Sequence, residues 1–147
     1  MLKKLIPSND KLLHEKIIKC SYNLDRGKLS YTLTENMFHH NGVGLSANQI
    51  GIKERAFVMI SDMESQDTLT CFNPKIVKES KEMVTMEEGC LSYPELFLDI
   101  DRPETIVVKY EDEGKELHKT KLTGFIARIF QHEYDHMEGI DFTQRTK

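Results

Sequence analysis

Apolar residues recur at helical spacing in two segments of the chain, one near each end. The first segment, residues 29–40, carries Leu, Leu, Met and Phe on one face and is followed by Asn41-Gly42, a typical C-terminal stop. The second begins at Thr123, a favourable N-cap, and extends to Gly139. Its stripe consists of Phe125, Ile129, His132 and His136, at offsets of 4, 7 and 11 residues. The pattern therefore predicts two helices, and one face of the second changes from apolar side chains to imidazoles.

Between these helices the chain changes to short runs rich in Val, Ile, Phe and Thr, which are typical of β-strands. Strands are predicted at residues 56–60, 70–77, 83–88, 105–111 and 115–122. The sequence Glu-Asp-Glu-Gly at 111–114 predicts a hairpin turn, so that the last two strands pair in antiparallel fashion. The order helix, strands, helix indicates an α+β fold in which an antiparallel or mixed β-sheet packs around the C-terminal helix.

Length and composition favour one domain spanning residues 1–147. With 39% hydrophobic and 30% charged residues the chain can bury one core, and no repeat or low-complexity linker divides it. Because 24 acidic residues outnumber 20 basic ones, the net charge of −4 argues against direct nucleic-acid binding. The apolar runs are too short for a membrane segment or a secretory signal, and three cysteines do not form a disulfide framework. We expect a cytoplasmic protein.

The residues His132-Glu133-Tyr134-Asp135-His136 form an HExxH motif within the second predicted helix. Residues four positions apart share a helical face, so both imidazoles can bind one cation while Glu133 lies beside it as an acid/base. A catalytic cation usually has three protein ligands and one position for water. A metzincin would supply a third histidine where this chain has Phe142, and the 11 residues after His136 leave no room for the distant carboxylate of a thermolysin-like site.

The third ligand is therefore expected upstream, among the cysteines, the other histidines and the carboxylates. Cys90 is favoured because Gly89 and Pro94 bracket it at the end of a predicted strand, whereas Cys20 and Cys71 lie in apolar stretches and are expected in the core. A thiolate with two imidazoles suits zinc, iron(II), cobalt or nickel, so the donors leave the identity of the metal open. The remaining histidines are expected to be solvent-facing or structural: His14, His39, His40 and His118.

Three stretches resemble the motifs of the peptide deformylase family. They are Gly42-Val43-Gly44-Leu45-Ser46-Ala47-Asn48-Gln49, Glu88-Gly89-Cys90-Leu91-Ser92 and Gln131-His132-Glu133-Tyr134-Asp135-His136. The resemblance implies one divalent cation per chain, bound by Cys90, His132 and His136, with Fe²⁺ as the expected native metal and Zn²⁺, Ni²⁺ or Co²⁺ as alternatives. It also implies a hydrolase that removes the N-formyl group from the N-terminal methionine of newly synthesised polypeptides and releases formate.

The resemblance assigns roles to further residues. Glu133 would transfer protons, while the Gln49 side chain and the Leu91 backbone N–H would bind the oxyanion of the tetrahedral intermediate. The residues implied in substrate binding are Val43, Gly44, Met86, Glu88, Phe125 and Ile129. The first two would pair with the peptide through their backbone, and the apolar ones would surround the methionine side chain. Glu88 is also expected to form an ion pair with Arg102.

The sequence departs from the family pattern at four places. Ser46 replaces the usual alanine, residues 95–98 are apolar where many members carry a basic residue, and Arg128 replaces an aliphatic residue. The chain also stops eight residues beyond Gly139, as in short members without the C-terminal helical extension, some of them encoded by bacteriophages. Ribosome contact by that helix is therefore in doubt.

The expected partner is the formyl-methionyl nascent peptide, with at most transient ribosome contact and a monomeric state. Two alternatives stay open at this point: a metallopeptidase that cleaves internal peptide bonds, and a catalytically silent metal-binding relative. The presence of Glu133 and Gln49 favours a hydrolase, because neither residue is needed merely to hold a metal.

Overall fold

The computed structural model describes residues 1–146 and has an α+β fold made of two antiparallel sheets and two longer helices. Its elements are η1 (Lys11–His14), α1 (Arg26–His39), β1 (Gly44–Ser46), η2 (Ala47–Ile50), β2 (Ala56–Asp62), β3 (Asp67–Glu79), β4 (Met83–Cys90), β5 (Tyr93–Pro103), β6 (Thr105–Glu111), β7 (Leu117–Thr123), α2 (Gly124–Met137) and η3 (Phe142–Arg145). The α+β class predicted from the sequence is confirmed, and all strand pairs that the structure describes are antiparallel.

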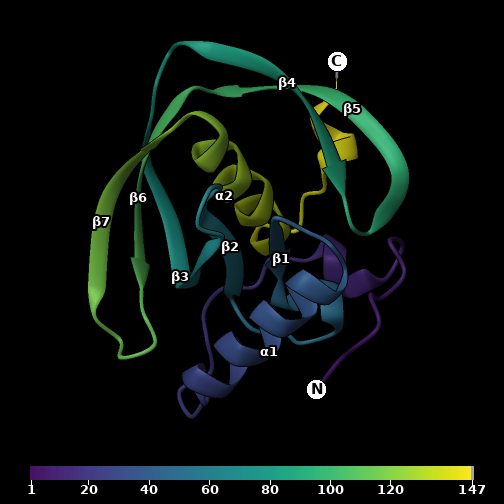
Figure 1. Cartoon of the computed structure of the whole chain (residues 1–147), viewed down its shortest axis with the longest axis vertical. Helices are drawn as coiled ribbons and strands as arrows, with labels where there is room; N and C mark the ends of the chain where they lie inside the picture. Colours follow the sequence, from purple (N-terminus) through teal and green to yellow (C-terminus); the bar gives the residue numbers. More distant parts are fainter. Residues whose placement is uncertain (147) are drawn as a thin grey trace.

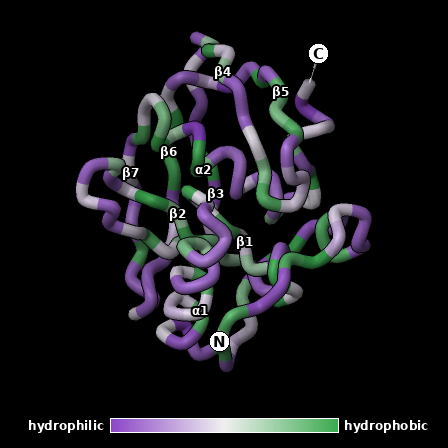
Figure 2. The backbone as a smooth tube through the Cα atoms, turned by 45° about the vertical axis from the view of Figure 1, so that its right-hand side comes forward, coloured by the Kyte–Doolittle hydropathy of each residue, from purple (hydrophilic) through white to green (hydrophobic). Residues whose placement is uncertain are grey.

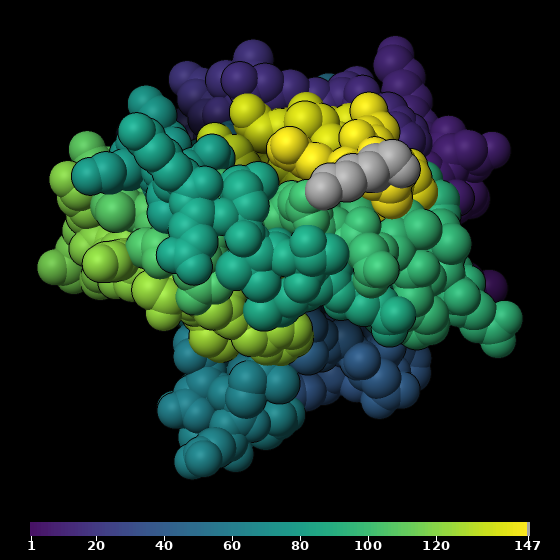
Figure 3. Space-filling view, turned by 90° about the horizontal axis from the view of Figure 1, so that it is seen from above, coloured from purple at the N-terminus to yellow at the C-terminus, as the bar shows by residue number. Residues whose placement is uncertain are grey.

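The larger sheet has five strands in the order β1-β2-β3-β6-β7, and β4 and β5 form a separate two-stranded sheet. Figure 1 shows α2 running between these two sheets. A two-stranded sheet is at best marginally stable alone. The β4–β5 sheet therefore depends on its contacts with α2 and with η3, which lies between the N-terminal segment and β5 in Figure 3.

Alternate residues of β2 point to opposite faces of the large sheet and enter two cores. Phe57 and Met59 pack with Ile129 and Phe130 of α2. Their neighbours on β2 pack with Leu33 of α1, on the other face. Figure 2 shows the hydrophobic residues gathered where the central strands and α2 meet. The two helices thus cover opposite faces of the sheet.

Both predicted helices are confirmed, each displaced by only a few residues at its ends. Helix α2 begins after the expected N-cap Thr123, and Gly139 beyond its end has the positive φ of 76° that favours glycine. Cys20 and Cys71 are buried, as expected for core residues. Neither longer helix, nor any shorter one among residues 1–146, has the length and apolarity that crossing a membrane requires.

The prediction missed two strands. β1 has only three residues, too few to show a period, and β5 carries charged residues and Pro94, which obscure its strand pattern. The interior of β5 also contains Glu95 with a positive φ of 66°. Both missed strands border the candidate site, so the helix of the site was easier to predict from the sequence than the strands that form its walls.

Candidate active site

The structure brings together the three residues that the sequence suggested as metal ligands. Cys90 is the last residue of β4, and His132 and His136 lie one turn apart on α2. Their donor atoms all lie within 4.8 Å of one another, and the Cys90 Sγ is 3.6 Å from the His136 Nε2. A soft sulfur and two imidazole nitrogens converging in a buried place fit the donor set of a divalent transition metal.

The Glu88 carboxylate orients His132. Its Oε1 is 2.9 Å from the His132 Nδ1, which leaves the Nε2 of this ring to face the Cys90 sulfur. Burial alone would lower the pKa of His132, but hydrogen bonds with Cys90 and Glu88 outweigh it and raise the pKa to about 10. For His136, burial and the neighbouring His132 lower the pKa to about 3. A bound cation would displace any proton from a ligating nitrogen, because the ligand is the neutral imidazole.

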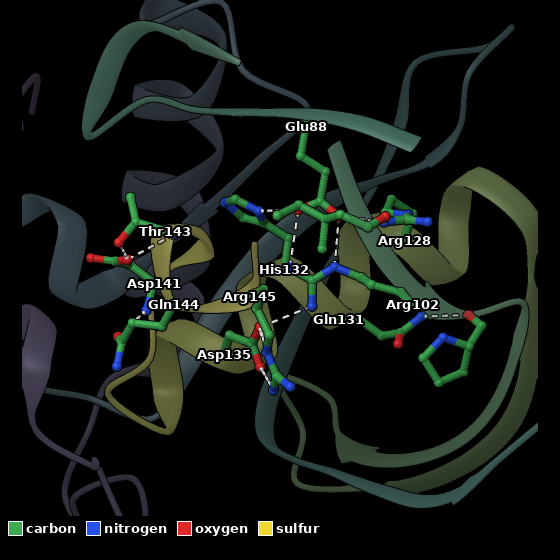
Figure 4. Close-up of polar contacts among 12 residues, drawn as sticks. Glu88, Arg102, Arg128, Gln131, His132, Asp135, Asp141, Thr143, Gln144 and Arg145 are labelled. Carbon is green, nitrogen blue, oxygen red and sulfur yellow. Dashed lines mark hydrogen bonds and ion pairs between the residues drawn. The ribbon is translucent and has the colours of Figure 1, made fainter. Parts of the chain in front are cut away.

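A buried chain of charged side chains supports Glu88 (Figure 4). Arg102 donates from Nε to Glu88 Oε2 at 2.6 Å and from Nη2 to Oε1 at 3.0 Å, so the ion pair expected from the sequence is present. Arg128 donates to the same Oε2 at 2.6 Å. Despite its burial, the hydrogen bonds with His132, Arg102 and Arg128 hold the pKa of the Glu88 carboxyl well below its usual range. On the far side, Arg102 and Arg145 both donate to Asp135.

The carboxylate of Glu133 lies on the inner side of the site and is 4% exposed. Among the described residues, its Oε1 has no hydrogen-bond partner. Burial raises the pKa of Glu133 to about 7, which suits a group that must both accept and donate a proton near neutrality. A Cβ at Gly44 would lie 2.6 Å from the Glu133 Oε2, so only glycine leaves room for this carboxylate. Gly44 of the motif at residues 42–49 thus packs closely against Glu133 of the HExxH motif.

The Gln49 side chain is fixed with its amide N–H directed toward the sulfur. Its Oε1 accepts a hydrogen bond from the Ser46 backbone N–H at 3.0 Å, and the Ser46 hydroxyl approaches the same oxygen at 3.1 Å. Its Nε2 donates to the Ser92 hydroxyl at 3.0 Å and lies 3.7 Å from the Cys90 Sγ. The serine at position 46, a departure from the usual alanine, donates its single hydroxyl hydrogen at the shorter distance of 2.6 Å to Asn48 Oδ1, so the Ser46 backbone N–H is the donor that fixes the Gln49 amide.

A cavity of about 550 Å³ opens beside these residues. Five of the six residues predicted to bind substrate line it: Val43, Gly44, Glu88, Phe125 and Ile129. Leu91, whose N–H was predicted as an oxyanion donor, lines it too. Met86 is half-buried on β4 and is not among the lining residues.

The cavity also has walls that the sequence did not suggest. Leu5 and His40 reach it from distant segments, and Tyr93, Leu96 and Phe97 reach it from the missed strand β5. The only sequence signal for these residues was the apolar character of residues 95–98. Arg128, noted as a departure from the family pattern, lines the cavity with its guanidinium buried against Glu88. The remaining histidines, His14, His39 and His118, are exposed or half-buried outside the cavity.

Comparisons with known proteins agree with this architecture. The sequence model of the family described as polypeptide deformylase matches residues 2–147. The peptide deformylase of Thermotoga neapolitana is 42% identical over 115 residues, which cover 78% of this chain and 68% of that protein. A peptide deformylase from a Thermotoga sp. is 44% identical, and the matched part covers 64% of its length. The chain thus spans about two thirds of the length of these curated relatives.

Solved structures match over almost the entire chain. The crystal structure of peptide deformylase from Thermotoga maritima has a TM-score of 0.92 and 34% identity, and the match covers 100% of this chain and 99% of that one. A Met-Ala-Ser-bound class I type b peptide deformylase from Acinetobacter baumannii has a TM-score of 0.91 and 31% identity, with 99% and 98% covered. The family match, the identities and the shared fold together establish that this chain belongs to the polypeptide deformylase family.

Proposed function

We propose that Cys90, His132 and His136 bind the catalytic metal of this chain and that Glu133 is its general acid/base. As a deformylase, the chain is a metal-dependent hydrolase that removes the N-formyl group from the methionine of newly synthesised polypeptides and releases formate. The observation that carries the residue assignment is the buried Glu133 carboxylate, with one oxygen unpartnered among the described residues, on the helix that supplies two of three converging metal donors.

One divalent cation per chain fits the donor set, and we propose Fe²⁺ as the native metal with Zn²⁺, Ni²⁺ or Co²⁺ as substitutes. Bound by the thiolate and the two imidazoles, the cation would polarise the formyl group and acidify a water molecule. Glu88 would keep the His132 ring in the ligating orientation through its bond to Nδ1. For Glu88 we thus propose a role in orienting a metal ligand, where the sequence suggested a contact with substrate.

The chain's own residues would then guide the hydrolysis. Glu133 would accept the proton of the attacking water and deliver it to the leaving amine, and its pKa near neutrality serves both transfers. The Gln49 Nε2, held by its Oε1 contacts, and the Leu91 backbone N–H would donate to the developing oxyanion. Val43 and Gly44 would pair with the peptide backbone, and Phe125 and Ile129 would contact the methionine side chain. Met86 does not line the cavity, and its contact with substrate stays a prediction.

We further propose that residues 1–147 form one catalytic domain that works as a monomer in the cytoplasm and meets the ribosome transiently. The nature of the substrate supports this, because a formylated nascent peptide must be met during or soon after synthesis. A metallopeptidase or a silent relative is not favoured, since the family match accompanies an intact acid/base and amide donor.

The test is formate release from formyl-Met-Ala-Ser by anaerobically purified protein, with metal content measured in parallel. The native chain should release formate; Glu133→Gln should retain metal and lose activity, and Cys90→Ala should lose metal. A metal-loaded native chain that releases no formate would refute the activity. Retained activity in Glu133→Gln would refute the assigned acid/base.

A further inference from the structure

Five lysines lie on one face of three neighbouring strands of the large sheet. Lys109 of β6 is register-paired with Lys75 of β3 on one side and with Lys119 of β7 on the other. Two residues along β6, Val107 is paired with Lys78 and Lys121 in the same way. Directly paired residues, and residues two apart on a strand, share a face. On β3 a register shift between Ile76 and Lys78 brings Lys78 onto the face of Lys75, although the two are three residues apart. We call this set, Lys75, Lys78, Lys109, Lys119 and Lys121, the lysine face.

The lysine face is turned away from the active-site helix. The alternate residues of β6, Ile106, Val108 and Tyr110, are buried in the core that contains α2. Four of the five lysines are exposed and Lys109 is half-buried. The lysine face is therefore an open surface on the opposite side of the sheet from α2, and any partner bound there leaves the catalytic cavity free.

No carboxylate balances these charges in the register. Among the described residues, none of the five lysines forms an ion pair within 4.0 Å. The acid next along β6, Glu111, is already paired with Arg26 at 2.8 Å, and Glu79 is paired in register with Ile106 of the buried face. Like charges placed directly opposite each other on a sheet are destabilising, whereas an alternation of lysine and glutamate would stabilise it. Although the chain has 24 acidic residues, none of them belongs to the two rows of paired residues that contain the five lysines.

We propose that the lysine face binds the phosphate backbone of single-stranded RNA. Neighbouring strands are about 4.8 Å apart and alternate residues about 6.8 Å, so the five ammonium groups spread over a patch roughly 10 Å wide that can contact several successive phosphates. The two rows of paired residues that carry the lysines contain only one other residue, Val107. They offer positive charge and no aromatic side chain, so the surface suits backbone contacts rather than base recognition. The expectation of no nucleic-acid binding was based on the net charge, and the net charge carries no information about where the sheet concentrates lysines.

The experiment is a titration of a fluorescent single-stranded oligouridylate with the native, metal-loaded chain at several salt concentrations. Five phosphate contacts predict a slope of log K against log salt of about −3.5, equivalent to roughly a hundredfold weaker binding between about 50 and 200 mM salt. Lys109→Gln with Lys119→Gln should reduce the slope by about 1.4, because each lost contact removes about 0.7. The matched control is Lys4→Gln with Lys11→Gln, two exposed lysines of the N-terminal segment, which Figure 1 places far from β7.

The same three proteins are assayed for formate release from formyl-Met-Ala-Ser. All should act on this short peptide equally, because neither lysine pair reaches the cavity, and this readout separates failure of the surface from failure of the proposed function. RNA binding that the Lys109/Lys119 change weakens and the control change does not would support the proposal. Absence of RNA binding at low salt, equal loss in both variants, or binding of anionic phosphatidylserine vesicles in place of RNA would each overturn it.

Discussion

Replacement of Arg128 by methionine tests whether this arginine holds the β4–β5 sheet against the active-site helix. Arg128 is 5% exposed and lies on α2, one turn before His132. Its guanidinium donates to Glu88 Oε2 at 2.6 Å, to the Ile100 carbonyl at 2.8 Å and to the Val84 carbonyl at 2.6 Å. It therefore links both strands of the small sheet to α2 and is one of two arginines on Glu88 (Figure 4).

The expected loss follows from these three bonds. A buried hydrogen bond to a charged partner contributes about 1.5–3 kcal/mol, and each of the two backbone acceptors about 1 kcal/mol more. Methionine recovers part of this by filling the space with an apolar chain, so we expect Arg128→Met to lower the free energy of unfolding by about 2–4 kcal/mol. For a chain of this size, that loss corresponds to a fall in melting temperature of roughly 5–15 °C. Because Glu88 orients His132, metal affinity should also fall about tenfold or more.

Two measurements separate this role from a general loss of packing: urea unfolding of the metal-free protein, and competition with a chelator for bound Co²⁺. The matched control is Arg26→Met, since Arg26 is also buried and donates to Glu111 at 2.8 Å and to the Asp112 carbonyl at 3.0 Å, far from the metal donors. Both variants should lose stability, but only Arg128→Met should release Co²⁺ more readily. Equal retention of Co²⁺ by the two variants would refute the reasoning, as would an Arg128→Met protein as stable as the native chain.

Three further changes probe the cavity, each read by formate release from formyl-Met-Ala-Ser together with metal content. Gly44→Ala should lower the rate while retaining metal, because its Cβ would displace the Glu133 carboxylate; an unchanged rate would show that this contact is dispensable. Gln49→Leu should lower kcat by about a hundredfold to a thousandfold, as expected for one oxyanion donor, and a change confined to KM would contradict that role. Chelation of the metal should abolish activity in the native chain, and re-addition of Fe²⁺ or Co²⁺ should restore it; activity that survives metal removal would exclude metal dependence.

The parts of the site that lie on one continuous helix were predictable from the sequence. His132, Glu133 and His136 are close because the helical repeat brings residues four apart onto one face, and that repeat is visible as a stripe of apolar and imidazole side chains. Cys90 could be favoured only from its context at a strand end, because no local rule connects it to a helix some forty residues later. Its place beside His136 is a property of the tertiary fold.

The cavity walls and the charged chain behind the site were not predictable in the same way. Leu5, His40 and Phe97 meet at the cavity only after three segments have packed, and their individual side chains carry no signal of that meeting. Within the charged chain, the pair of Glu88 with Arg102 was expected from the family resemblance, but nothing in the sequence indicated that Arg128 and Asp135 of α2 are buried and paired with partners from β4 and β5. Hydrophobic periodicity cannot predict such ion pairs, because it shows which positions are apolar and does not show which charged side chains find a partner of opposite charge.

Arg128 and the lysine face show two ways in which this fold uses positive charge. A buried guanidinium requires several acceptors in fixed directions. Arg128 uses Nη1 for the Glu88 carboxylate and the Ile100 carbonyl and Nη2 for the Val84 carbonyl, whereas an ammonium group has only one nitrogen from which to donate. The lysines of β3, β6 and β7 have no such partners in the register and remain hydrated on an open face. The buried arginine therefore holds the metal site in its geometry, whereas the lysines, which have no ion-pair partner among the described residues, stay available to a polyanion from solution. The net charge of −4 reveals neither arrangement, because it sums over the whole chain.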